Sequence, residues 1–393
     1  MHRIRFANQL RGLAALGVAC SHLIGVYWVF PAVVTAATAS SPPLPQALPG
    51  LFWLVGHPWF NLGPFGVGVF FLISGLVIPI SLGTHSRLSF LGARLLRIFP
   101  TYVACLLLLV GVIALNAAGW GRPFPYRIGD VVGNALLGYD LVGRPSIDLV
   151  NWTLSIELKF YVLVVLLAPW IRRGSVLALL GVGVAVFACD RLIAAGVLGP
   201  ADPAPSTPGY TASSHLLCLT FMLMGTAFNY HLRGLVRTRT LLAVLAALAG
   251  LFVLTWRTSV WAVQFPVVTV NYAYALALFG GLYAVRRHIP ANPVLDAMAA
   301  ISFPFYVLHS ILGFSVMRLL MTSAGWPYYP ALAAAVLTIL AAATLIHRAV
   351  ERPTIRAGRH LAPRRPVSEA SPTRDRGVTD FEASSASRFP GQS

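Results

Sequence analysis

A few ionisable side chains interrupt stretches of sequence that are otherwise apolar. His22, Glu157 and His309 each lie in an apolar stretch long enough to cross a membrane. Burying such groups in a bilayer is costly, so each is a candidate for function by default. Imidazole exchanges protons near neutral pH, and a nearby carboxylate stabilises its charged form. We therefore expect proton-transfer chemistry in a polar cavity that these three side chains share.

Further ionisable residues in these stretches are Arg11, Lys159, Asp190 and Arg318. Arg11 and His22 are eleven residues apart, which is nearly three helical turns, so both side chains point to the same side of one helix. Roughly 16 Å along the helix axis separates them. We place His22 and Glu157 at a similar depth, with His309 near the middle of the bilayer. For any one of these residues alone, a hydrogen bond to a neighbouring helix is the competing interpretation.

The composition identifies the solvent of these helices. Of the 393 residues, 57% are hydrophobic and 10% are charged, whereas a soluble domain carries about 25% charged residues. Lipid must therefore solvate the excess apolar surface. Runs such as residues 103–115 and 241–254 are continuously apolar, which favours helices over the alternating strands of a membrane barrel. The net charge of +17 does not indicate nucleic-acid binding, because the basic residues only punctuate the apolar runs.

Hydrophobic periodicity and length predict an all-α fold, a polytopic transmembrane bundle of about ten helices. The predicted spans are residues 8–31, 62–81, 98–117, 150–171, 175–195, 213–230, 240–256, 262–285, 298–320 and 329–348. We predict a transmembrane domain over residues 1–350. Residues 351–393 are predicted to form a basic cytoplasmic tail that is largely disordered.

Arginines fix the expected orientation, because cytoplasmic loops of membrane proteins carry the excess of positive charge. One set of alternating loops holds Arg3, Arg5, Arg87, Arg94, Arg97, Arg172, Arg173, Arg233, Arg237, Arg239, Arg286 and Arg287. The other set holds fewer arginines, diluted by Asp130, Asp140, Asp148 and Asp202. The first set is therefore predicted to be cytoplasmic, together with both termini.

Six short segments in one order resemble the acyltransferase 3 family of membrane acyltransferases. They are FANQLRGLAA at 6–15 with His22 following, GVGVFFLISG at 66–75, ARLLRIFPTY at 93–102, WTLSIELKFY at 152–161, ISFPFYVLH at 301–309 and VERP at 350–353. The resemblance runs from about residue 4 to residue 360. Asn8 and Gly68 stand where that family often has Asp, and Phe303 replaces a common Tyr.

The resemblance implies a cytoplasmic acyl-CoA donor as co-substrate and an acceptor hydroxyl that is reached from the outer side. Arg11, Arg94 and Arg97 are the expected binding residues for the CoA phosphates, since Arg forks bind phosphate oxygens. His22 is the expected general base, or a transient acyl acceptor, with Glu157 orienting it. The expected substrate-binding residues are Ser74, Trp152, Tyr306 and His309, with no metal.

The sequence thus predicts an O-acyltransferase of the bacterial cytoplasmic (inner) membrane. The expected partners are acyl-CoA, with acetyl as the acyl group, and a glycan, lipid-linked sugar or other hydroxyl acceptor of the cell envelope. A transporter or flippase for lipid-linked sugars is the alternative, because it shares the many helices and the buried polar residues. The prolines near Gly63-Pro64 and Phe303-Pro304 are compatible with the broken helices of transporters.

Overall fold

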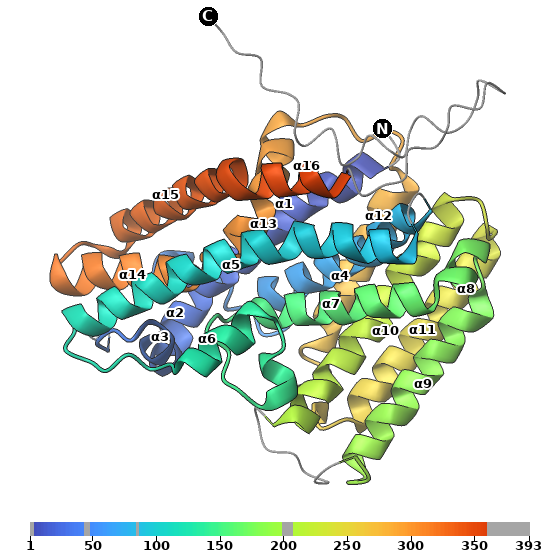
Figure 1. The fold of residues 1–393 in the computed structure, drawn as a ribbon, viewed down its shortest axis with the longest axis horizontal. Helices are drawn as coiled ribbons and strands as arrows, with labels where there is room; N and C mark the ends of the chain where they lie inside the picture. The colour runs from blue at the N-terminus through green and yellow to red at the C-terminus, as the bar shows by residue number, and fades with distance from the viewer. Residues whose placement is uncertain (1–3, 43–47, 84–85, 199–206, 360–393) are drawn as a thin grey trace, which may run out of the picture.

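The computed structural model describes residues 4–42, 48–83, 86–198 and 207–359, and its regular elements are helices (Figure 1). They are α1 (Arg5–Cys20), η2 (Ser21–Val26), α2 (Tyr27–Val29), α3 (Pro31–Thr38), η3 (Gly50–Leu54), α4 (Leu62–Leu82), α5 (Arg87–Gly119), α6 (Ile128–Ala135), η4 (Tyr139–Val142), α7 (Asn151–Leu166), α8 (Ala168–Arg173), α9 (Val176–Ala194), α10 (Pro208–Leu232), α11 (Thr238–Thr258), η5 (Ala262–Gln264), α12 (Thr269–Ala284), α13 (Pro293–Leu308), α14 (Ile311–Arg318), η6 (Leu319–Ser323), α15 (Tyr328–Ile346), η7 (His347–Glu351) and α16 (Arg352–Arg359). The predicted all-α, polytopic class is confirmed.

Within the described residues, seven helical stretches are long and apolar enough to cross a membrane: Arg5–Val29, Leu62–Leu82, Arg87–Gly119, Val176–Ala194, Pro208–Leu232, Thr238–Thr258 and Tyr328–Gly358. An eighth is the pair α13 and α14, which is bent by 68° at its break. The other two predicted spans hold α7 and α12, which have 16 residues each. Such helices are about 24 Å long, shorter than the hydrocarbon core of about 30 Å. Whether they cross the bilayer stays a prediction.

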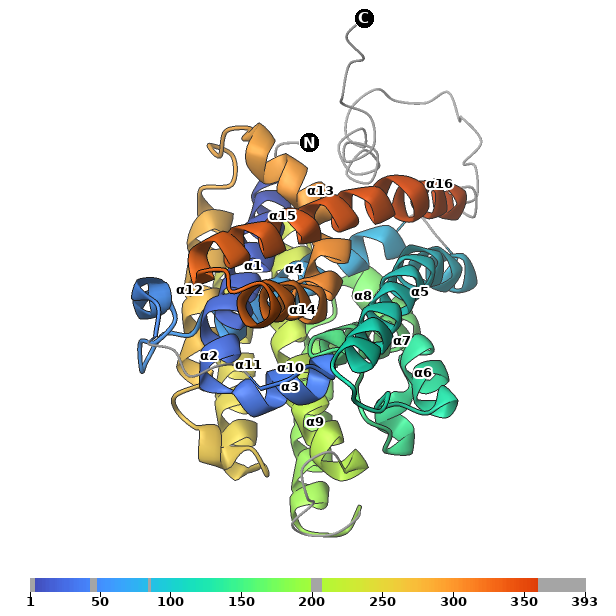
Figure 2. The same cartoon turned by 90° about the vertical axis from the view of Figure 1, so that its left-hand side faces the viewer.

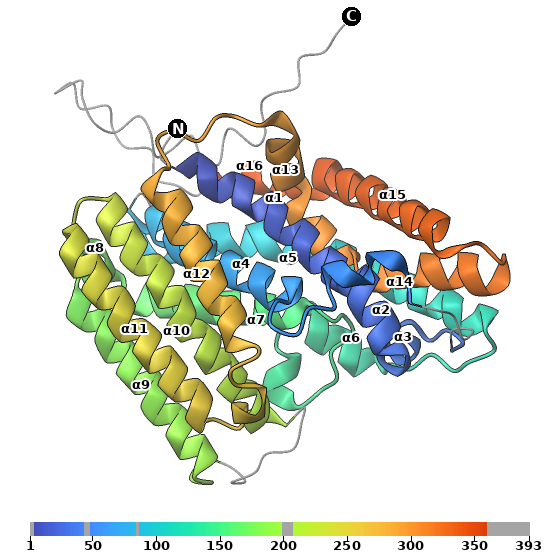
Figure 3. The ribbon, with the colours of Figure 1, turned by 180° about the vertical axis from the view of Figure 1, so that it is seen from behind.

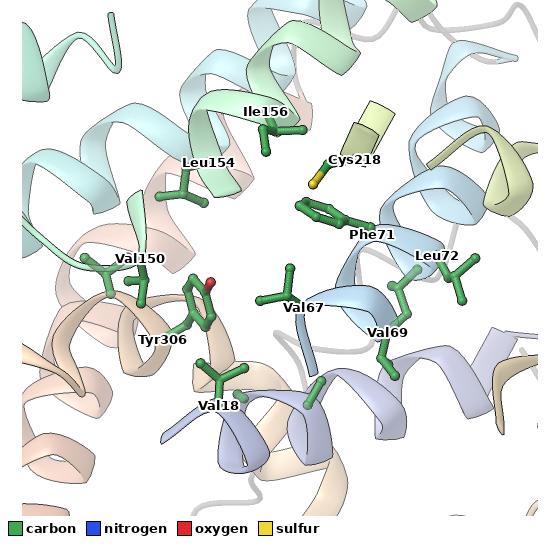
Figure 4. Close-up of a cluster of buried hydrophobic side chains, with 14 of the residues drawn as sticks. Val18, Val67, Val69, Phe71, Leu72, Val150, Leu154, Ile156, Cys218 and Tyr306 are labelled. Carbon is green, nitrogen blue, oxygen red and sulfur yellow. The ribbon is translucent and has the colours of Figure 1, made fainter. Parts of the chain in front are cut away.

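The centre of the bundle is α4, which packs against α1, α10 and α12 (Figure 3). Its apolar side chains Val67, Phe71 and Leu72 meet residues of other helices, among them Val18 of α1 and Cys218 of α10 (Figure 4). Two glycines permit the closest crossing. A Cβ atom added at Gly75 would lie 2.0 Å from the carbonyl oxygen of Met222, and one added at Gly225 would lie 2.4 Å from that of Leu72. The Gly75 that ends the GVGVFFLISG segment is therefore a packing residue.

The first turn of α7 is covered by the chain before it. The side-chain amide of Asn151, at the start of α7, donates to the Tyr102 hydroxyl at 3.1 Å and to Asn134 Oδ1 at 2.7 Å. The same Asn134 oxygen accepts from the backbone N–H of Ile147 at 3.1 Å. Irregular backbone is tolerated at membrane depth only where protein covers and satisfies it. Residues 128–150 therefore extend the bundle where α7 is too short.

The last helix continues past the predicted domain boundary. After the π-helical segment η7, α16 carries the chain to Arg359 and packs along α5 (Figure 2). The first nine residues of the predicted tail, 351–359, are thus helical and belong to the bundle. The rest of that tail, residues 360–393, lies outside the described residues.

Candidate active site

A cavity of about 130 Å³ lies between α1, α4, α5, α7, α13 and the η7 segment. Its charged or titratable lining residues are Arg11, Arg97, Glu157, His347 and Glu351, and its hydroxyl-bearing ones are Ser74, Thr153, Ser302 and Tyr306. Four elements that are distant in the sequence, α1, α5, α7 and η7, therefore bring two guanidinium groups and two carboxylates to one space. Such a mixed-charge chamber within an apolar bundle is typical of a binding site.

The two carboxylates of the cavity have hydrogen-bond partners on their own helices. The Tyr161 hydroxyl donates to Glu157 Oε1 at 2.5 Å. His347 Nδ1 lies 2.7 Å from Glu351 Oε2, an i, i+4 pair in η7. The sequence analysis did not select His347 and Glu351 as site residues. Their spacing on the final membrane helix was the available signal, since i and i+4 residues share a helix face.

The three arginines expected to bind phosphates divide into two roles. Arg11 and Arg97 line the cavity. Arg94 does not: its residue is 4% exposed, it donates a short hydrogen bond to Ser81, and its guanidinium carbon lies 5.6 Å from the centroid of the Phe90 ring. Arg94 is thus held in the wall between α4 and α5. Together with Arg97 it lines a small adjoining pocket.

His22 and His309 form a hydrogen-bonded pair, with His309 Nε2 2.9 Å from His22 Nδ1 and the two rings stacked 4.9 Å apart. Glu157 was expected as the partner of His22; within the described chain His22 bonds to His309, and Glu157 accepts a hydrogen bond from Tyr161. Neither histidine lines the cavity. The ring of Tyr306, which does, lies 5.7 Å from that of His309, so the pair stands directly behind this side of the chamber.

Both histidines lie where a helix departs from α geometry. His22 is in the π-helical segment η2, and His309 is in the two-residue break at which α13 bends into α14. π-Helical turns and broken membrane helices occur frequently at functional sites. The two helices run together from their starts, with Gly12 against Ala299 and Gly313 against Leu23. Because they are parallel, the two irregular turns meet at the same depth.

The remaining predicted residues lie around the cavity. Ser74 and Tyr306 line it, and the Tyr306 hydroxyl bonds to that of Thr153 at 3.0 Å. Trp152 does not line it and instead packs edge-on against Phe71, at 6.3 Å between ring centroids. Its predicted contact with substrate is therefore not provided by this cavity.

Three other charged residues of the bundle lie outside the cavity lining. Lys159 Nζ is 2.6 Å from Asp140 Oδ2, which ties α7 to η4. Asp190 of α9 accepts a hydrogen bond from Ser213 of α10. Arg318 is fully buried with its guanidinium carbon 5.0 Å from the centroid of the Tyr27 ring. We assign no chemistry to these residues.

Comparison with known proteins identifies the family of the chain. No curated protein and no solved structure matches the chain. The profile of one family, the acyltransferase domain of the acyltransferase 3 group, matches residues 4–347, nearly the whole chain. That range includes both histidines, the cavity arginines and Glu157. The chain therefore belongs to the acyltransferase 3 family and is a membrane acyltransferase.

Proposed function

We propose that the protein transfers an acyl group, with acetyl as the expected one, from cytoplasmic acyl-CoA to a hydroxyl of a cell-envelope glycan or a related acceptor. The observation that supports this proposal is the short separation between the cavity wall at Tyr306 and the histidine pair. The cavity extends from Arg11 and Arg97 to Tyr306, and the histidine pair lies behind Tyr306. Tyr306 is about two helical turns further along the parallel pair α1 and α13 than the level of Arg11.

In this scheme the two ends of the cavity bind different parts of the donor. Arg11 and Arg97 bind the CoA phosphates, because a guanidinium fork matches phosphate oxygens. The pantetheine arm then extends along Ser74 and Glu157 and brings the thioester to Tyr306. The acyl group passes Tyr306 when its hydrogen bond to Thr153 opens, and so reaches His22.

The chemistry is general-base catalysis of acyl transfer. His22 takes the proton of the acceptor hydroxyl while that oxygen attacks the thioester carbonyl carbon. The C–S bond breaks, and the imidazolium returns its proton to the leaving thiolate of CoA. Hydroxyl groups beside the thioester, those of Tyr306 and Ser74, donate hydrogen bonds to the oxyanion that develops.

The experiment is an assay of purified protein in lipid nanodiscs with radiolabelled acetyl-CoA and an extract of envelope glycans. We expect free CoA to appear together with labelled acceptor, and His22→Ala to reduce both by roughly 100-fold or more at equal protein abundance. Full activity of His22→Ala would end the general-base role. Mass spectrometry of envelope glycans from cells with and without the gene then identifies the acceptor by its lost acyl mass.

The bend between α13 and α14 favours a second candidate, a transporter or flippase for lipid-linked sugars, since discontinuous helices are common in transporters. A transporter consumes no acyl-CoA. The nanodisc assay separates the two, because only an acyltransferase releases CoA in proportion to added acceptor.

A further inference from the structure

We propose that His309 is a positioning residue that fixes the tautomer of His22, so that Nε2 of His22 is the nitrogen that accepts the acceptor's proton. This inference rests on the proposed general-base role of His22 and deepens it. It follows from one chain of hydrogen bonds, which runs from the Tyr306 carbonyl through His309 to His22.

The first link sets the proton on His309. Nδ1 of His309 lies 2.6 Å from the backbone carbonyl oxygen of Tyr306. A carbonyl oxygen only accepts hydrogen bonds, so Nδ1 carries the hydrogen. This carbonyl is in the last turn of α13, where carbonyls lack partners within the helix. The bend after Leu308 therefore gives the ring of His309 a fixed acceptor.

The surroundings of His309 keep its ring neutral. The residue is fully buried, with the rings of Phe305 and Tyr306 at 6.3 and 5.7 Å, and the described chain places no carboxylate within ion-pair distance of it. An unpaired buried cation would be strongly destabilising. A neutral imidazole with its hydrogen on Nδ1 has a lone pair on Nε2, so Nε2 of His309 accepts.

The second link transmits that choice to His22. Because His309 Nε2 accepts across the 2.9 Å contact, Nδ1 of His22 must donate. A neutral His22 then holds its lone pair on Nε2. His22 retains accessible surface, unlike His309, and its hydrogen bond within the described chain is made through Nδ1. Nε2 of His22 is thus the basic nitrogen. When Nε2 gains a proton, the hydrogen bond from Nδ1–H of His22 to His309 is kept.

The direct test is nitrogen-15 NMR of protein labelled at histidine, in which the two tautomers of a neutral ring give different nitrogen shifts. The His22 signal is assigned by its loss in His22→Ala. We expect the Nδ1–H tautomer in the unmodified protein and its loss in His309→Leu. An Nε2–H tautomer of His22 in the unmodified protein would overturn the proposal, whatever the activity.

A pair of variants separates positioning from structure. Leucine at residue 309 offers no acceptor, so His309→Leu should lower kcat by roughly 100-fold or more while KM for acetyl-CoA stays within about threefold. In His309→Gln the amide oxygen can accept from His22 and the amide N–H can donate to Tyr306, so kcat should stay within about tenfold of the unmodified value. Equal losses in the two variants, or full activity in both, would contradict the positioning role. If His22→Ala is fully active instead, the proposed function fails while the tautomer result stands.

Discussion

Neighbouring arginines on α5 have different environments, and therefore different expected mutant phenotypes. Arg97→Ala should raise KM for acetyl-CoA more than it lowers kcat, because this guanidinium lines the cavity. Arg94→Ala should lower stability by about 1–3 kcal/mol, since Arg94 packs on Phe90 and bonds to Ser81 inside the protein. Thermal unfolding and steady-state kinetics on both variants check the division. An unchanged affinity of Arg97→Ala for acetyl-CoA would contradict the assignment of Arg97 to the donor site.

Asp148, which precedes α7, should make stability fall as pH rises. Burial raises the pKa of its carboxyl from 3.8 to about 7, although the backbone N–H of Val150 bonds to Oδ1 at 2.6 Å. Between pH 4 and pH 7 the folded protein keeps this proton and the unfolded chain loses it. The protonated carboxyl therefore makes its full contribution to the free energy of unfolding below pH 4. This contribution, at most about 4 kcal/mol, is lost as pH rises from 4 to 7.

Unfolding midpoints of Asp148→Asn test this effect, because the amide resembles the protonated acid. The variant should be more stable than the unmodified protein between pH 5 and pH 8, and the difference in unfolding midpoint should widen as pH rises. Asp130 is the control of opposite sign. The backbone N–H of Arg127 and the Arg144 side chain lower the pKa of Asp130, so its contribution is lost only as pH falls below about 4. A constant gap across the pH range would refute the Asp148 argument.

At the scale of the helices, apolar periodicity located most spans, but the geometry inside them was not readable from it. The apolar pattern carries no signal for the π-helical turn at His22 or for the size of the 68° bend after Leu308. The pairing of residues 287 positions apart depends on both irregularities. The sequence placed His22 and Glu157 at one depth, and depth alone could not tell which neighbour each would meet. For that reason Glu157 was predicted beside His22.

The crossing of α4 and α10 should be intolerant of one added methyl group. In Gly75→Ala the new Cβ would stand 2.0 Å from the Met222 carbonyl oxygen, so the helices must separate. We expect a loss of about 1–3 kcal/mol or more. Gly111→Ala on α5 is the matched control, because nothing lies within 4 Å of its added Cβ, and a helical Gly→Ala change should gain about 0.5–1 kcal/mol. Equal unfolding temperatures of the two variants would disprove the close-packing role.

For the molecule as a whole, the direction of acyl transfer depends on whether short α7 crosses the bilayer. Exposed Arg122 follows α5, and exposed Arg239 is in the first turn of α11. Between them lie α9, α10 and the pair α7 and α8. If α7 and α8 together make one pass, three passes separate the two arginines and they face opposite compartments. If α7 only dips into the membrane, two passes separate them and they face the same one.

Cysteine labelling in spheroplasts distinguishes these topologies. With the exposed native Cys189 replaced by Ser, Arg122→Cys should react with a membrane-impermeant maleimide, and Arg239→Cys should react only after the membrane is opened. That outcome follows from the excess of arginine on the Arg239 side and from the seal that residues 128–150 place over α7. Labelling of both in intact spheroplasts would make α7 re-entrant. Glu157 would then enter the cavity from the outer side, opposite to the donor.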